Sequence, residues 1–131
     1  MIQIENEIYT ELRGLLLDNY QGIYVSGEYT PTPDSLPCAF IEESDNYTVS
    51  LNGSNEDEVA NVTFEINVFS NLPTGQRKSQ CKKIMNTIDD HMTSRGFVRL
   101  MCQRTPNLDP TVYRMTARYQ ASVFRDGIYR S

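Results

Sequence analysis

The sequence predicts an α+β fold, with a mainly antiparallel or mixed sheet of about four to five strands and two helices packed on one face. The first observation is the stretch Val59–Ser70, where apolar and polar residues alternate with the period of two typical of a strand. The second is the following segment, where apolar residues recur at helical spacing. A length of 131 residues fits one domain, 1–131, that needs no metal or disulfide to fold.

These two segments also predict the core. The strand places Val62, Phe64, Ile66 and Val68 on one face. The helix would cover that face with Cys81, Ile84, Met85, Ile88 and Met92. We therefore expect Phe64 and Ile66 to point to the helical layer.

The chain begins with a predicted amphipathic helix over residues 3–18. Ile4, Ile8 and Leu12 form its apolar stripe, and Gly22 marks the exit from the helix. Residues 23–26 are expected to form a short strand.

A proline-rich loop and a second strand follow. Residues 27–37 contain three prolines, each of which removes a backbone donor and disfavours helix in the residue before it. Residues 38–43 predict a strand with Ala39 and Ile41 on one face and Cys38 and Phe40 on the other.

The segment 45–58 has two interpretations. Alternating Tyr47, Val49 and Leu51, followed by the turn signal Asn52-Gly53, predict a projecting β-hairpin arm whose second leg runs into the central strand. Its acidic end carries Glu56, Asp57 and Glu58. The other interpretation is a solvated surface loop. The alternation favours an arm that binds a partner.

The second helix is expected to run to about Arg95, with Gly96 at its C-cap. Basic residues near its start and acidic residues near its end oppose the helix dipole, so packing must hold it. Strands are then expected at residues 97–103 and 113–123, followed by a short tail after the turn Asp126-Gly127.

Net charge and cysteine usage exclude several classes. A charge of −5 and a pI of about 4.8 argue against a nonspecific DNA-binding surface, although an acidic lining would let DNA slide past. Three widely spaced cysteines and a single His91 predict reduced, buried thiols in a cytoplasmic protein rather than a zinc site. The sequence shows no signal peptide and no apolar run of membrane-spanning length, so no membrane partner is expected.

We predict no catalytic, cofactor-binding or metal-ligating residues in this sequence. His91 has no partners for nucleophilic catalysis, and Glu42 and Glu43 point to opposite faces of a strand. The cluster Glu56-Asp57-Glu58 lacks the spacing of a calcium loop.

Arg114 and Arg118 lie on the polar face of the last strand, with Arg99 and Arg104 on or near its neighbour. This basic face is a candidate protein–protein surface. The alternative is cross-strand pairing with Glu65 and Glu42.

The order of elements resembles that of the tail terminator and tail-completion proteins of long-tailed bacteriophages. The similarity covers essentially the whole chain. It is carried by L-P-C-A-F-I-E within Leu36–Glu42, the strand Val62–Ser70, the Gly96-Phe97 junction, and Y-R-M-T-A-R-Y at Tyr113–Tyr119.

The resemblance implies a virion protein with no catalytic residues, located at the head-proximal end of the tail and present in the host cytoplasm during assembly. It implies a ring, usually of six copies, that stops tail-tube polymerisation. Its partners would be other copies of itself, the tail tube protein, the head–tail connector proteins, and genomic DNA passing through the lumen without sequence-specific binding.

Two alternatives remain open: a head-completion, minor capsid or neck protein of a phage, and a small binding module or enzyme on the same framework. For the ring, the candidate interface comprises Tyr47, Val49, Leu51, Glu56, Asp57, Glu58, Arg114 and Arg118.

Overall fold

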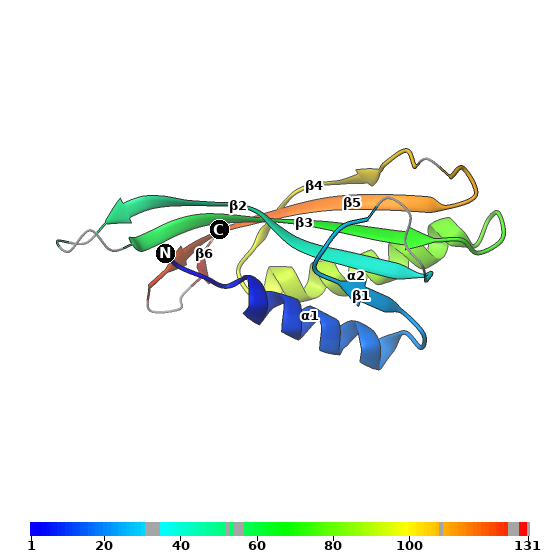
Figure 1. Cartoon of the computed structure of the whole chain (residues 1–131), viewed down its shortest axis with the longest axis horizontal. Coiled ribbons are helices and arrows are strands. Elements are labelled where there is room, and N and C mark those ends of the chain that lie inside the picture. Colours follow the sequence, from blue (N-terminus) through cyan, green and yellow to red (C-terminus); the bar gives the residue numbers. More distant parts are fainter. Residues whose placement is uncertain (31–34, 52, 54–56, 108, 126–128, 131) are drawn as a thin grey trace.

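A computed structural model shows two helices and a mixed, mostly antiparallel sheet, as the sequence predicts (Figure 1). It describes residues 1–30, 35–51, 53, 57–107, 109–125 and 129–130. The helices are α1 (Glu5–Asn19) and α2 (Arg77–Ser94). The strands are β1 (Tyr24–Ser26), β2 (Cys38–Leu51), β3 (Asp57–Ser70), β4 (Val98–Arg104), β5 (Tyr113–Phe124) and β6 (Tyr129–Arg130).

The sheet has the strand order β1-β2-β3-β5-β4, with β6 paired to β5. β1 runs parallel to β2, and the other pairs are antiparallel. The long strand β3 occupies the centre, with β2 on one side and β5 on the other. Both helices lie on one face of the sheet (Figure 1).

The core lies between this face and the helices. Phe64 and Ile66 of β3 are fully buried in one cluster with Ile84 and Ile88 of α2, which confirms the predicted register. The buried residues of α2 are the predicted set: Cys81, Ile84, Met85, Ile88 and Met92. In β5, the fully buried Ala117 leaves room for the close approach of the helical layer.

Helix ends follow the glycine signals in the sequence. Gly22 has φ +79° after α1, and Gly96 has φ +96° after α2. A residue with a side chain rarely adopts such a backbone conformation, so glycine favours both exits.

The opposite face of the sheet carries a second, smaller apolar cluster. It contains Cys38, Phe40 and Phe69, and Leu36 and Val112 pack against it. The predicted split of β2 between two faces is thereby confirmed, because Ala39 and Ile41 lie in the main core.

Three features differ from the expectations. β2 does not end at Glu43 but continues to Leu51, and the tail contributes β6. β4 is interrupted by a register shift between Arg99 and Met101, so its side chains do not alternate regularly. Pro31, Pro33 and the turn Asp126-Gly127 lie outside the described residues.

Candidate interaction surfaces: the hairpin arm and the helix-free face

The segment 45–58 contributes two paired strands rather than a loop. The ends of β2 and β3 pair in antiparallel fashion from Asp45↔Thr63 as far as Leu51↔Asp57. These paired ends extend beyond both helices, and we call residues 45–51 of β2 and 57–61 of β3 the arm (Figure 1). Residues 52 and 54–56, among them the predicted turn residue Asn52 and the predicted interface residue Glu56, lie outside the described residues.

Apolar side chains on the arm are only half covered. Tyr47 is 45% exposed, Val49 50% and Leu51 53%. Within this trio, Tyr47 accepts through its hydroxyl a hydrogen bond that Asn61 Nδ2 donates at 3.0 Å. The chain alone therefore leaves this apolar surface in contact with water.

Regular alternation does not extend along the whole arm. Register shifts fall between Thr48 and Ser50 and between Ser50 and Leu51. Such irregularities insert an extra residue and twist the strand locally. Tyr47, Val49 and Leu51 are thus exposed as expected, but they do not form the simple one-sided stripe that a strict period of two predicts.

Arg118 is paired within the chain. It lies directly opposite Glu65 in the β3–β5 register, and its Nε and Nη2 donate to Glu65 Oε1 at 3.2 and 3.1 Å. The cross-strand alternative is therefore confirmed for Arg118 and Glu65. An exposed ion pair of this kind contributes about 0–1 kcal/mol to stability.

Arg114 has a different environment. Its Nε donates to Asn67 Oδ1 at 3.0 Å, and its guanidinium lies 4.8 Å from the centre of the Tyr29 ring and 5.5 Å from that of Phe69. Arg114 is half-buried and packs against the aromatic rings of the helix-free face. Both predicted arginines, Arg114 and Arg118, therefore already have contacts within the chain.

Polar ladders extend across the same face. The buried Asn67 also accepts a hydrogen bond from Thr116 Oγ1 at 2.7 Å. Gln120 donates to Thr63, and Ser122 donates to Asn61. These cross-strand contacts satisfy polar groups and favour one register of β3 against β5.

His91 is not an isolated surface residue. Its Nε2 lies 2.8 Å from Glu11 Oε1, and Arg95 lies 3.1 Å from the same oxygen and 3.0 Å from a Glu7 oxygen. The last turns of α2 are thereby tied to the first half of α1. Because this contact joins residues 80 positions apart, helical periodicity alone could not indicate it.

Asp89 also has a structural partner that sequence reasoning missed. The buried Tyr119 donates a hydrogen bond to Asp89 Oδ1 at 2.8 Å, and Arg99 lies 3.3 Å from the same oxygen. Burial, with the hydrogen bond to Asp89, raises the pKa of Tyr119. The acidic residue near the end of α2 thus anchors the helix to β4 and β5.

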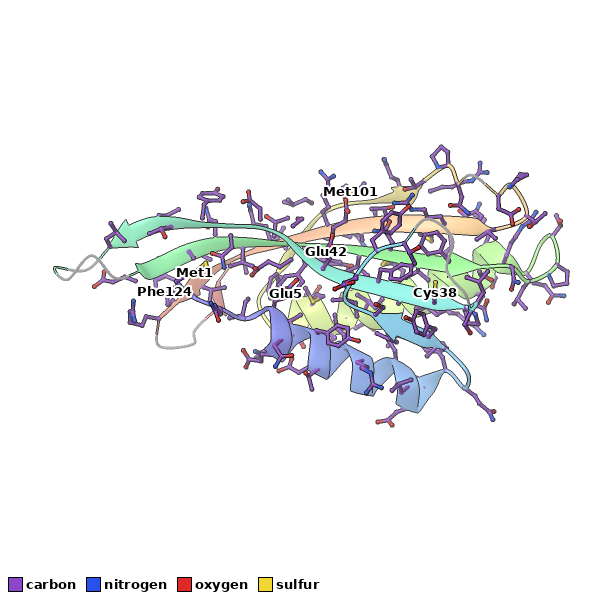
Figure 2. All side chains as sticks on the ribbon, viewed as in Figure 1. Met1, Glu5, Cys38, Glu42, Met101 and Phe124 are labelled. Atoms are coloured by element: carbon purple, nitrogen blue, oxygen red, sulfur yellow. The ribbon has the colours of Figure 1, made fainter. Side chains whose placement is uncertain are left out.

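A groove of about 680 Å³ runs between the start of α1 and β2. Its lining includes Glu5, Glu28, Glu42 and Glu43, of which Glu5 and Glu42 are labelled in Figure 2. Glu5 Oε2 accepts a hydrogen bond from the backbone N–H of Glu43 at 2.8 Å. Burial, and then the charge of Glu5, raises the pKa of Glu43.

Metal-ligating side chains are scattered in the described part of the chain. No cluster of three or more His, Cys, Asp or Glu side chains there is arranged to hold a metal ion. Cys38, Cys81 and Cys102 are free thiols. Within the same described residues, neither helix has the length and apolar character needed to cross a bilayer.

The predicted interface residues therefore fall into separate groups. The arm holds Tyr47, Val49 and Leu51 together, with Asp57 and Glu58 at the start of its second strand. Arg114 and Arg118 lie on β5, each with a partner within the chain. No protein-family model matches the sequence, and no curated protein matches it either.

Proposed function

We propose that this chain is a structural virion protein similar to phage tail terminators. Copies would assemble, in a ring of about six, on the head-proximal end of the tail tube. The ring would stop tube polymerisation and join the tail to the head connector proteins. Genomic DNA would pass through its lumen without sequence-specific binding, and the chain itself would perform no catalysis.

The exposed arm is the observation that carries this proposal. A half-exposed apolar side chain costs stability that a partner can recover, and complete burial of one such side chain is worth roughly 1.5–3 kcal/mol. The first strand of the arm extends beyond the helices, and its Tyr47, Val49 and Leu51 stay about half exposed in the single chain (Figure 1). A second copy or a tube subunit is the kind of partner that could.

Two further observations support the proposal. The α+β architecture, with helices on one face of a mainly antiparallel sheet, is the one that the resemblance implies. The net charge of −5 suits a lumen that repels passing DNA more than a surface that retains it.

The test uses tail tubes from the phage or prophage whose genome encodes the chain. Purified protein is added to isolated tubes, which are imaged by negative-stain electron microscopy. We expect a ring of added density at one end of each tube and arrested growth when tube protein is supplied. Growth unchanged from that of untreated tubes, or a genome that encodes no tail, would overturn the proposal.

A matched pair of variants separates the arm from general surface effects. Replacement of Tyr47, Val49 and Leu51 by Ser removes the exposed apolar surface and should abolish capping. Replacement of Leu17, which is 41% exposed on α1, by Ser should leave capping intact. Circular dichroism of both variants checks that they fold.

A further inference from the structure

The sheet has two edges, and each carries exposed apolar side chains. β4, together with the short β6 that also pairs with β5, forms one edge, and β1 with β2 forms the other. β1 pairs only with Cys38–Phe40, so the rest of β2 has β3 on one side and no strand on the other within the described residues. Such unpaired edges are templates for pairing with another chain.

The N-terminal segment covers part of the β2 edge. Glu5 accepts from the Glu43 amide, and Asn46 donates to the Ile2 carbonyl at 2.8 Å. Both of these contacts lie on β2 at or before Asn46. The arm, from Tyr47 to Leu51, is therefore the available part of this edge.

The exposed apolar residues concentrate on these two strands. Of the nine large hydrophobic side chains classed as exposed among the described residues, three lie on the arm and two lie on β4: Val98 at 44% and Leu100 at 53%. Met101, which follows Leu100 on β4 and is labelled in Figure 2, is half-buried. Two apolar patches thus lie at opposite edges of one sheet, which is the arrangement a head-to-tail contact requires.

Strand directions fit a contact between the two edges. β2, β3, β5 and β4 are successively antiparallel, so β2 and β4 run in opposite directions. Rotation about a ring axis leaves the direction of a strand along that axis unchanged. The β2 edge of one copy would therefore meet β4 of the next copy in antiparallel orientation, which needs no reversal of either subunit.

Charge also favours this match. The described strands of the arm contain Asp45, Asp57 and Glu58 and no Lys or Arg. β4 contains Arg104 and Arg99, of which Arg99 also pairs with Asp89 of α2, and no acidic residue. Opposite charges on the two edges would guide association and disfavour contacts between two arms or two β4 strands.

We propose that the arm of one copy adds as an antiparallel strand to β4 of the next copy, around a closed ring. The inference rests on the proposed assembly and names its interface. Alignment of Leu51 with Val98 offsets neighbouring copies by about six residues along the strands, and a sheet that closes on itself needs such a stagger. The irregularities in both strands limit the shared ladder to a few residues.

Disulfide crosslinking tests this interface. In a Cys102→Ser background, two double variants share one antiparallel register: Leu51→Cys with Val98→Cys, and Val49→Cys with Leu100→Cys. Within one copy these positions lie three strand spacings apart, roughly 14 Å, which is beyond the reach of a disulfide. A crosslink must therefore join two copies.

We expect mild oxidation to give a ladder at multiples of the 15.0 kDa chain, ending in one closed species and collapsing under reductant. The control pair Leu17→Cys with Leu100→Cys has similar exposure and should stay uncrosslinked. The single variant Leu51→Cys should also give no ladder. A dimer that forms from this variant alone would indicate a two-fold arm-to-arm contact and overturn the inference.

Light scattering on the same samples separates the possible failures. Oligomers without a ladder from either pair would overturn this interface and leave the ring standing. Single chains without a ladder would overturn both proposals. A ladder from protein that does not cap tail tubes would support the interface and reject the tail-terminator role.

Discussion

At the residue scale, Phe64 shows how the core is held together. Its side chain is fully buried, and its ring meets that of Phe97 edge-on with centroids 5.7 Å apart. Phe64→Ala would leave a cavity beneath the helices and should lower the free energy of unfolding by about 3–5 kcal/mol. Urea denaturation at a fixed protein concentration measures this change.

Leu17→Ala provides the control, because Leu17 is exposed on α1 and its loss should change stability by about 0.5 kcal/mol or less. Equal effects of the two substitutions would contradict the assigned position of Phe64.

Buried thiols predict a loss of stability at alkaline pH. Burial raises the pKa of Cys38 and of Cys81 to about 12. The folded state therefore holds these protons more tightly than the unfolded state, whose thiols titrate near the ordinary value of 9.0. The contribution of the two protonated thiols to the free energy of unfolding should be complete below pH 9 and be lost as the pH rises toward 12.

Denaturation at a series of pH values measures how the free energy of unfolding depends on pH. The double substitution Cys38→Ala with Cys81→Ala should reduce this dependence between pH 9 and 12.

At pH 8, a thiol reagent should modify the half-buried Cys102 well before Cys38 and Cys81. Rapid labelling of all three thiols in the native protein would contradict their burial.

Arg114 and Arg118 show which contacts of single residues could be predicted from the sequence and which could not. Their place on the polar face of β5 could be predicted from alternation, and Glu65 was already an expected partner of Arg118. The stacking of Arg114 on Tyr29 could not be predicted, since it depends on the path of the proline-rich loop. Polar pairings across distant segments, such as His91 with Glu11, have no periodic signal.

At the scale of elements, a repeating pattern decided what could be predicted. β3, α2 and β5 show unbroken periodicity, and their buried faces are the expected ones. The sequence predicts residues 38–43 as one strand and residues 45–58 as a separate hairpin arm. In the structure β2 runs from Cys38 to Leu51 without a break, because its pairing with β3 continues past the register shift between Glu43 and Asp45.

The arm yields a prediction at this scale. Reversal of Glu56, Asp57 and Glu58 to Lys should weaken association by repulsion from Arg99 and Arg104 on β4 of the next copy. The monomer should remain folded, because the arm projects from the core (Figure 1). Sedimentation velocity at low and high salt measures the change, and salt should partly mask the repulsion.

A charge-reversal control is Asp18→Lys with Asp90→Lys, since both residues are exposed and lie on the helices rather than on the arm. This variant should associate like the wild type. If the arm reversal also leaves ring formation, tube capping and particle infectivity unchanged, the arm has no role in assembly.

At the scale of the whole molecule, the fold class followed from two segments, but the strand order did not. Alternation shows that a strand has a buried face and is silent about its neighbours. The placement of β4 at the far edge, and hence the pair of opposite apolar edges, required the three-dimensional arrangement. The exposed apolar side chains were predictable on the arm and not on β4.

The central claim is that copies of this chain close into a ring, and its most direct test is the mass of the protein in solution. Size-exclusion chromatography with multi-angle light scattering at tens of micromolar should give one species of about 90 kDa, six times the 15.0 kDa chain. Averaged electron micrographs of that species should show a closed ring with a central opening. A single species at 15.0 kDa across the same concentration range would contradict the account.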